Sequence, residues 1–149
     1  MTGALGKVVF GFVAAAISVV LVHESIIFLL KMAGMIPAEA WSMKPVPPYG
    51  VPTLANSIFW GGLWGVLFAL IADRIPIGQM WLKGLIFGLC ILVLSNWLIL
   101  ALIKSRPLFA GFDPIRMLDG VLILSGFGIA MALIYEVLQT KMISKTARS

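Results

Sequence analysis

Four long apolar runs take up most of this chain of 149 residues. A helix needs about 20 consecutive apolar residues to cross the hydrocarbon core of a bilayer, and each run reaches that length. Charged residues make up only 11% of the chain, whereas soluble domains contain about a quarter. We therefore predict an all-α fold, an integral membrane bundle of four transmembrane helices that are antiparallel neighbours joined by short loops. The predicted spans are about 5–30, 53–72, 80–103 and 115–138.

The length outside these runs limits the function. The whole chain, 1–149, is predicted to be a single membrane domain without room for a globular catalytic domain. The sequence shows no nucleophile with an adjacent base, no acidic pair and no cluster of metal ligands. His23 is the only histidine, which excludes bis-histidine ligation of haem within one copy. We therefore predict a protein that is not an enzyme and that has neither a metal nor a cofactor.

The basic residues predict the orientation of the chain. The formal net charge is +5, but the eleven Lys and Arg are scattered at the ends of the apolar runs, where they suit lipid headgroups better than nucleic acid. Four spans place both termini on one side. Six cations belong to that side and five to the other, and the basic tail 139–149 directly follows the last span. The positive-inside rule therefore favours cytoplasmic termini.

The connections contain residues that end helices and form loops. Gly34 and Pro37 are predicted to end the first helix, and Asp113 before Pro114 to begin the last. The first run is about twice as long as the apolar part of a signal peptide, so we expect it to be retained as a transmembrane helix. Residues 37–52 hold five of the eight prolines. They predict an extended or polyproline-like loop on the membrane rim, with a docking segment of the PxxP kind as the alternative.

Small residues predict how the helices pack. They recur every four positions in the second span, and two glycines repeat the spacing in the third: Ser57, Gly61, Gly65 and Ala69, then Gly84 and Gly88. Helix association in lipid gains nothing from the hydrophobic effect, so it depends on close backbone approach over such ridges. The pattern indicates packing and does not indicate a particular function.

Polar residues gather in the half of each span nearest the proline-rich loop. The candidate intramembrane site consists of His23, Glu24, Asn56, Asn96, Arg116 and Asp119. An ionisable group inside a bilayer costs at least about 2.5 kcal/mol, so each is a candidate for function. Glu24 has the strongest case. The alternative is that these groups satisfy one another and fix the helix register, with Arg116 and Asp119 pairing locally.

The first span has two different faces if it is a regular helix. Gly11, Ala14, Ala15, Ser18 and Ser25 form a seam of small residues. At 100° per residue His23 and Glu24 then project on either side of the opposite face. If the seam packs inside the bundle, His23 or Glu24 must meet another span, a second copy, a foreign subunit or water. This geometry is the main reason to expect a partner.

Three segments carry a resemblance to a known family. They are MKPVPPYGVP at 43–52, FWGGLWG at 59–65 and FDPIRM at 112–117. In these segments the chain resembles an uncharacterised family of small four-span inner-membrane proteins of proteobacteria. The resemblance implies a bacterial inner membrane as the location, and it implies no activity, substrate or cofactor.

Three classes of function fit these observations unequally. The first is a non-catalytic accessory or interaction subunit, whose partners are membrane lipid and either a second copy or another membrane protein. The alternative is a small oligomeric permease or channel in which Glu24 and His23 carry protons or bind a solute. Four spans are few for an internal pathway, and no inverted repeat is evident. An enzyme acting on a lipid or quinone is the least supported class.

Overall fold

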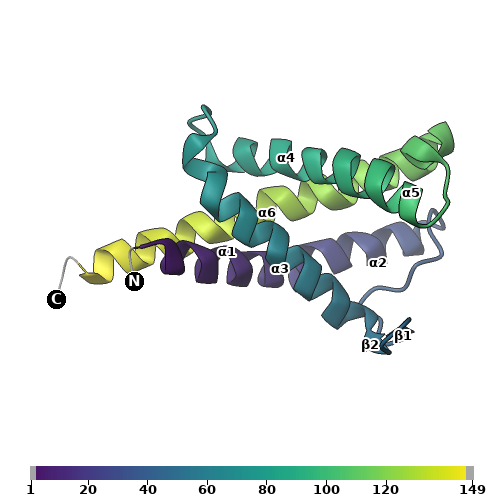
Figure 1. Cartoon of the computed structure of the whole chain (residues 1–149), viewed down its shortest axis with the longest axis horizontal. Coiled ribbons are helices and arrows are strands. Elements are labelled where there is room, and N and C mark those ends of the chain that lie inside the picture. The colour runs from purple at the N-terminus through teal and green to yellow at the C-terminus, as the bar shows by residue number, and fades with distance from the viewer. Residues whose placement is uncertain (1–2, 147–149) are drawn as a thin grey trace.

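The computed structural model describes residues 3–146 and is mostly helical. Four helices are long and apolar enough to cross a membrane: Ala4–Met32, Thr53–Arg74, Met80–Ile103 and Pro114–Ser144. Four long apolar helices are thus confirmed at the predicted runs. The start of the first helix and the end of the last lie at one end of the molecule, and the proline-rich segment lies at the other (Figure 1). This segment defines what we call the loop end.

The first long helix is interrupted in its middle. It consists of α1 (Ala4–Ser18), a π-helical turn η1 (Val19–His23) and α2 (Glu24–Met32). Gly34 ends it with a φ of 73°, while the Gly34 amide donates to the carbonyl of Lys31 and the Met35 amide to that of Leu30. These bonds use carbonyls that the helix end would otherwise leave free, so the predicted glycine cap is confirmed.

The proline-rich segment forms a very short hairpin. Strands β1 (Pro45–Val46) and β2 (Val51–Pro52) are antiparallel, and the Pro47–Pro48 peptide bond is cis. The prediction of extended chain holds for these residues, but pairing of the two strands was not foreseen. The Thr53 amide donates to the Lys44 carbonyl at 2.9 Å, which joins the hairpin to the next helix.

The remaining elements complete the other three long helices. They are α3 (Thr53–Ile71), the 3₁₀ turn η2 (Ala72–Arg74), α4 (Met80–Ile91), the π-helical segment η3 (Leu92–Ile99), α5 (Leu100–Ile103), the 3₁₀ segment η4 (Leu108–Phe112) and α6 (Pro114–Thr146). The Asp113 carboxylate accepts from the amide of Ile115 at 2.9 Å and caps α6 as predicted.

α6 is longer than the sequence pattern predicted. The span was expected to end near 138, with a basic tail at 139–149, but the helix continues to Thr146. Residues 139–146 include neither glycine nor proline, so nothing local stops the helix where the apolar run ends. Residues 147–149 of the predicted tail lie outside the described residues.

The glycine ridges determine which helices approach closely. A Cβ on Gly65 would lie 2.2 Å from the carbonyl oxygen of Gly11 in α1, and a Cβ on Gly84 would lie 2.2 Å from that of Gly128 in α6. Gly61, Ala69 and Gly88 are also buried, and the first ridge residue, Ser57, is half-buried. The ridge prediction is therefore confirmed for α3 against α1 and for α4 against α6.

The second and third spans are a different case. They were predicted to be antiparallel neighbours, but the extensive helix contacts are α1 with α3, α4 with α6 and α1 with α6. α3 and α4 meet through aromatic side chains, with the ring centroids of Phe68 and Phe87 5.2 Å apart. The two spans therefore touch, but their backbones do not pack closely, because each glycine ridge approaches a different helix.

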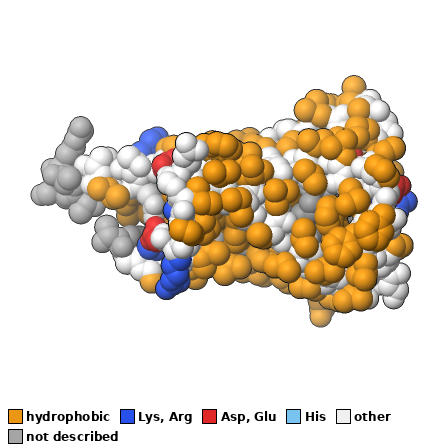
Figure 2. Space-filling model, turned by 90° about the horizontal axis from the view of Figure 1, so that it is seen from above, with side chains coloured by type: hydrophobic (Ala, Val, Ile, Leu, Met, Phe, Trp, Pro, Cys, Tyr) orange, Lys and Arg blue, Asp and Glu red, His pale blue; other side chains and the backbone are white. Residues whose placement is uncertain are grey.

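The side chains are distributed as expected for a small membrane bundle. Phe68, Met131 and Tyr135 are among the residues of the buried core. Figure 2 shows hydrophobic side chains over the central part of the visible face and charged side chains towards its ends. Large apolar side chains on all four long helices remain exposed, including Leu21, Trp60, Leu94 and Leu122. Such a surface suits lipid contact.

Candidate functional site

The π-helical turn in the first span changes which residues face the bundle. The Glu24 amide donates to the carbonyl of Val19, five residues earlier, and not to that of Val20 as an α-helix requires. The wider turn shifts the rest of the helix by about one residue position. Glu24 is therefore only 4% exposed. The seam residues before the turn, Ala14, Ala15 and Ser18, are buried as well.

The predicted orientation of Glu24 is therefore wrong. The prediction assumed a regular helix in which Glu24 lies opposite the small-residue seam. The π turn carries Glu24 into the protein, while Ser25, which was assigned to the seam, is half-buried and donates its hydroxyl to the Leu21 carbonyl. The inference of a partner at Glu24 loses its basis, because the chain itself covers this carboxylate.

The Glu24 carboxylate binds the segment that precedes the hairpin. Its Oε2 accepts the backbone N–H of Trp41 at 2.6 Å, and its Oε1 lies 3.1 Å from Nδ1 of His23. The Trp41 indole N–H donates to the carbonyl of Val20 at 2.9 Å. This is the carbonyl that the π turn releases from the helical bonding pattern. We call Val20, His23, Glu24 and Trp41 the loop anchor.

Trp41 has an unusual backbone conformation within the loop anchor. Its φ is 49°, in the left-handed region that residues other than glycine rarely adopt. The two hydrogen bonds to the first span hold it there, and its ring centroid lies 6.1 Å from that of Phe28. The sequence contained no signal for the released carbonyl that the Trp41 indole binds.

His23 and Ser18 link the first span to α6. The His23 and Phe127 rings meet edge to face, with centroids 6.3 Å apart. The buried Ser18 hydroxyl donates to the Phe127 carbonyl at 2.8 Å. One short stretch of the first helix therefore contacts both α6 and the proline-rich segment.

The other predicted polar residues do not join the loop anchor. Asn56 is half-buried and Asn96 is exposed, and neither side chain makes a hydrogen bond within residues 3–146. Arg116 is exposed and its Nε lies 3.7 Å from Asp113 Oδ2. Asp119 is 6% exposed, and its Oδ1 has no hydrogen-bond partner in the described part of the chain. The predicted pairing of Arg116 with Asp119 is wrong, because Arg116 reaches back to the capping residue.

The loop anchor has the chemistry of a structural connection. Both oxygens of Glu24 have partners within the chain, and the carboxylate is closed off by Trp41. Among the described residues, no group of three His, Cys, Asp or Glu is arranged to hold a metal ion. The arrangement fastens the loop to the middle of the first span.

No family model, no curated protein and no solved structure matches this chain.

Proposed function

We propose that the protein is a small non-catalytic subunit of an integral membrane assembly, which it joins through the exposed face of its third span. The observation that carries this proposal is Asn96. Its side chain is exposed on η3, and flanking apolar residues such as Leu94 and Ile99 are 54% and 53% exposed. The amide thus lies on an otherwise apolar surface.

The depth of Asn96 supports a partner at this face. At about 1.5 Å per residue it lies about 7 Å from the middle of its span, inside a hydrocarbon half-thickness of about 15 Å. A carboxamide there that lacks hydrogen bonds costs several kcal/mol. Its N–H₂ donates and its oxygen accepts, so the same amide of a second copy complements it, as does a polar residue of another membrane protein.

The permease alternative has less support. It assigned proton or solute binding to Glu24 and His23, but Glu24 is engaged by Trp41 and His23 in the loop anchor. A transported proton or solute would have to displace those bonds. The structural role of Glu24 and the exposure of Asn96 both favour an interaction subunit.

Asn96→Leu is expected to weaken assembly of the protein in mild detergent. One interhelical hydrogen bond in a membrane contributes about 1–2 kcal/mol, which corresponds to roughly 5- to 30-fold in the dissociation constant. Native mass spectrometry of the purified complex measures the change and identifies either a second copy or a foreign subunit. Leu122→Ala, an apolar change on the exposed face of the fourth span, is the control. If Asn96→Leu assembles with the same dissociation constant as the unchanged chain, the proposal is refuted.

The proposed location is the bacterial inner membrane, with cytoplasmic termini. The location is supported by the family resemblance, and the orientation by the six-to-five distribution of cations. The start of α1 and the end of α6 lie together, as this topology requires (Figure 1). The loop end would then face the periplasm.

Cysteine labelling tests this orientation. Cys90 is exposed on the third span and is first replaced by alanine. Cysteines placed at Tyr49 and Ser105 are expected to react with an impermeant thiol reagent added to intact cells, and a cysteine at Ser144 only after lysis. The opposite pattern would place the termini outside.

A further inference from the structure

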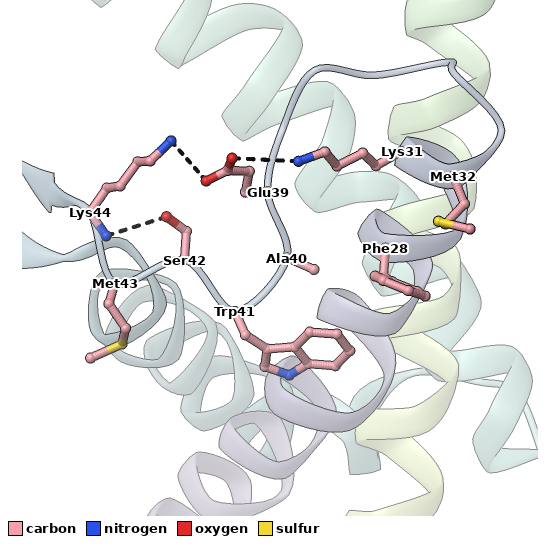
Figure 3. A pocket seen from close by; sticks show the side chains of 9 residues that line it. All are labelled: Phe28, Lys31, Met32, Glu39, Ala40, Trp41, Ser42, Met43 and Lys44. Carbon is pink, nitrogen blue, oxygen red and sulfur yellow. Dashed lines mark hydrogen bonds and ion pairs between the residues drawn. The ribbon is translucent and has the colours of Figure 1, made fainter.

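A cavity lies between the end of α2 and the segment before β1. It has a volume of about 840 Å³, and Figure 3 shows the side chains that line it. Its charged residues are Lys31, Glu39 and Lys44. Trp41 forms part of its wall, so the bonds of the loop anchor fix the position of that wall.

The cavity has two basic residues and only one acidic residue. Lys44 Nζ lies 2.8 Å from one oxygen of Glu39, and Lys31 Nζ lies 3.5 Å from the other. The hydrogen bond and charge of Lys44, together with those of Lys31, hold the pKa of Glu39 below its ordinary value of 4.5. At neutral pH one carboxylate therefore faces two ammonium groups. A net positive charge remains, and each ammonium has N–H donors beyond the one used by Glu39.

The rest of the cavity wall is apolar and exposed. Phe28, Met32 and Trp41 are 46%, 73% and 41% exposed. Phe28 and Met32 lie on the last turns of the first span, on the same helix as the exposed Leu21. Figure 3 shows the lysine side chains of the cavity reaching towards Glu39, with Phe28 and Trp41 beside each other below them. Cations therefore lie next to an apolar surface where the helix leaves the predicted membrane.

We propose that this cavity binds an anionic phospholipid. Lys31 and Lys44 donate to the headgroup phosphate, and an acyl chain lies along Phe28 and Met32. Glu39 is an internal anion that competes with the phosphate for the same two ammonium groups. A lipid is favoured over a free phosphate because the cations adjoin apolar side chains that a soluble anion would leave exposed. The inference rests on the membrane location proposed above.

The test compares lipids and three variants in purified protein. Phosphatidylglycerol and phosphatidylcholine are titrated into the protein in mild detergent, and bound lipid is counted by native mass spectrometry. A cationic residue near a lipid surface contributes roughly fivefold in affinity. The double variant Lys31→Gln, Lys44→Gln is expected to bind phosphatidylglycerol about 25-fold more weakly. Glu39→Gln is expected to bind it about fivefold more tightly, and Lys104→Gln, a cation at the same end outside this cavity, serves as the control.

The gain expected for Glu39→Gln keeps the proposal falsifiable, because a misfolded variant would not bind more tightly. Equal affinity for the two lipids, or weaker binding by Glu39→Gln, would overturn the proposal. An equal loss in Lys104→Gln would show nonspecific attraction and would overturn it as well. If free glycerol phosphate competes as well as the lipid at equal concentration, the site is for a soluble anion. Assembly measured in the same spectra reports on the proposed subunit role independently.

Discussion

Gly65→Ala is expected to destabilise the bundle strongly, although it adds only one methyl group. The new Cβ would lie 2.2 Å from the carbonyl oxygen of Gly11 and 2.4 Å from Cβ of Ala15. A backbone oxygen has no alternative rotamer, so α1 and α3 must move apart and lose contacts along the ridge. Overpacking of this kind typically costs about 1–3 kcal/mol, and Gly65→Leu should cost more. Unfolding of the purified protein in detergent, followed by circular dichroism, measures the loss.

Two other glycines provide graded controls for this prediction. A Cβ on Gly61 would meet a methyl carbon of the Val19 side chain at 2.6 Å, so Gly61→Ala should have a smaller effect. A Cβ on Gly78 would have no neighbour within 4 Å, so Gly78→Ala should leave stability unchanged. If Gly65→Ala unfolds at the same midpoint as the unchanged protein, the α1 and α3 backbones are not held in close contact.

The fold was predictable wherever a local pattern determines it. The apolar runs set the number of long helices, because crossing a bilayer requires a fixed length. Gly34 and Asp113 marked helix ends through their own backbone and side-chain chemistry. The ridge containing Gly61 and Gly65 predicted a close contact between helices. The sequence did not reveal which helix each ridge would meet, because every span presents small residues and the choice depends on the whole bundle.

The candidate site was less predictable because it depends on a change in helical geometry. Nothing in the residues Val19–His23 marks a π turn, and one such turn moves Glu24 from the predicted outer face to the interior. The bond from Trp41 then depends on a contact between residues 17 positions apart. Of the predicted polar residues only His23 and Glu24 come together in the loop anchor. The depth of a residue along its span can be counted from the sequence, but its partners depend on the rotation of each helix about its axis, which that count does not give.

Replacing Glu24 by alanine is expected to release the proline-rich loop, whereas replacing it by glutamine is not. Alanine leaves the Trp41 amide without its acceptor, and loss of a hydrogen bond to a buried charged group costs about 1–3 kcal/mol. Glutamine keeps an oxygen for Trp41, and its N–H₂ can donate to His23 in the tautomer that accepts at Nδ1. Hydrogen exchange of residues 33–52, measured by mass spectrometry in detergent, should be fast in Glu24→Ala and slow in Glu24→Gln.

The matched control for Glu24 is Glu39, an exposed carboxylate in the loop that Glu24 holds. Its contacts with Lys31 and Lys44 lie at the surface, where ion pairs contribute little, so Glu39→Ala should leave the Trp41 amide protected. Slow exchange in Glu24→Ala would show that the loop is held without the anchor. Fast exchange in Glu24→Gln as well would mean that the negative charge, and not the shape of the acceptor, holds Trp41. Trp41 is held by two bonds, one to the Glu24 carboxylate and one to the Val20 carbonyl released by the π turn. Glu24→Ala removes only the first. Partial protection of the loop amides in this variant would therefore measure the contribution of the indole bond to Val20 alone.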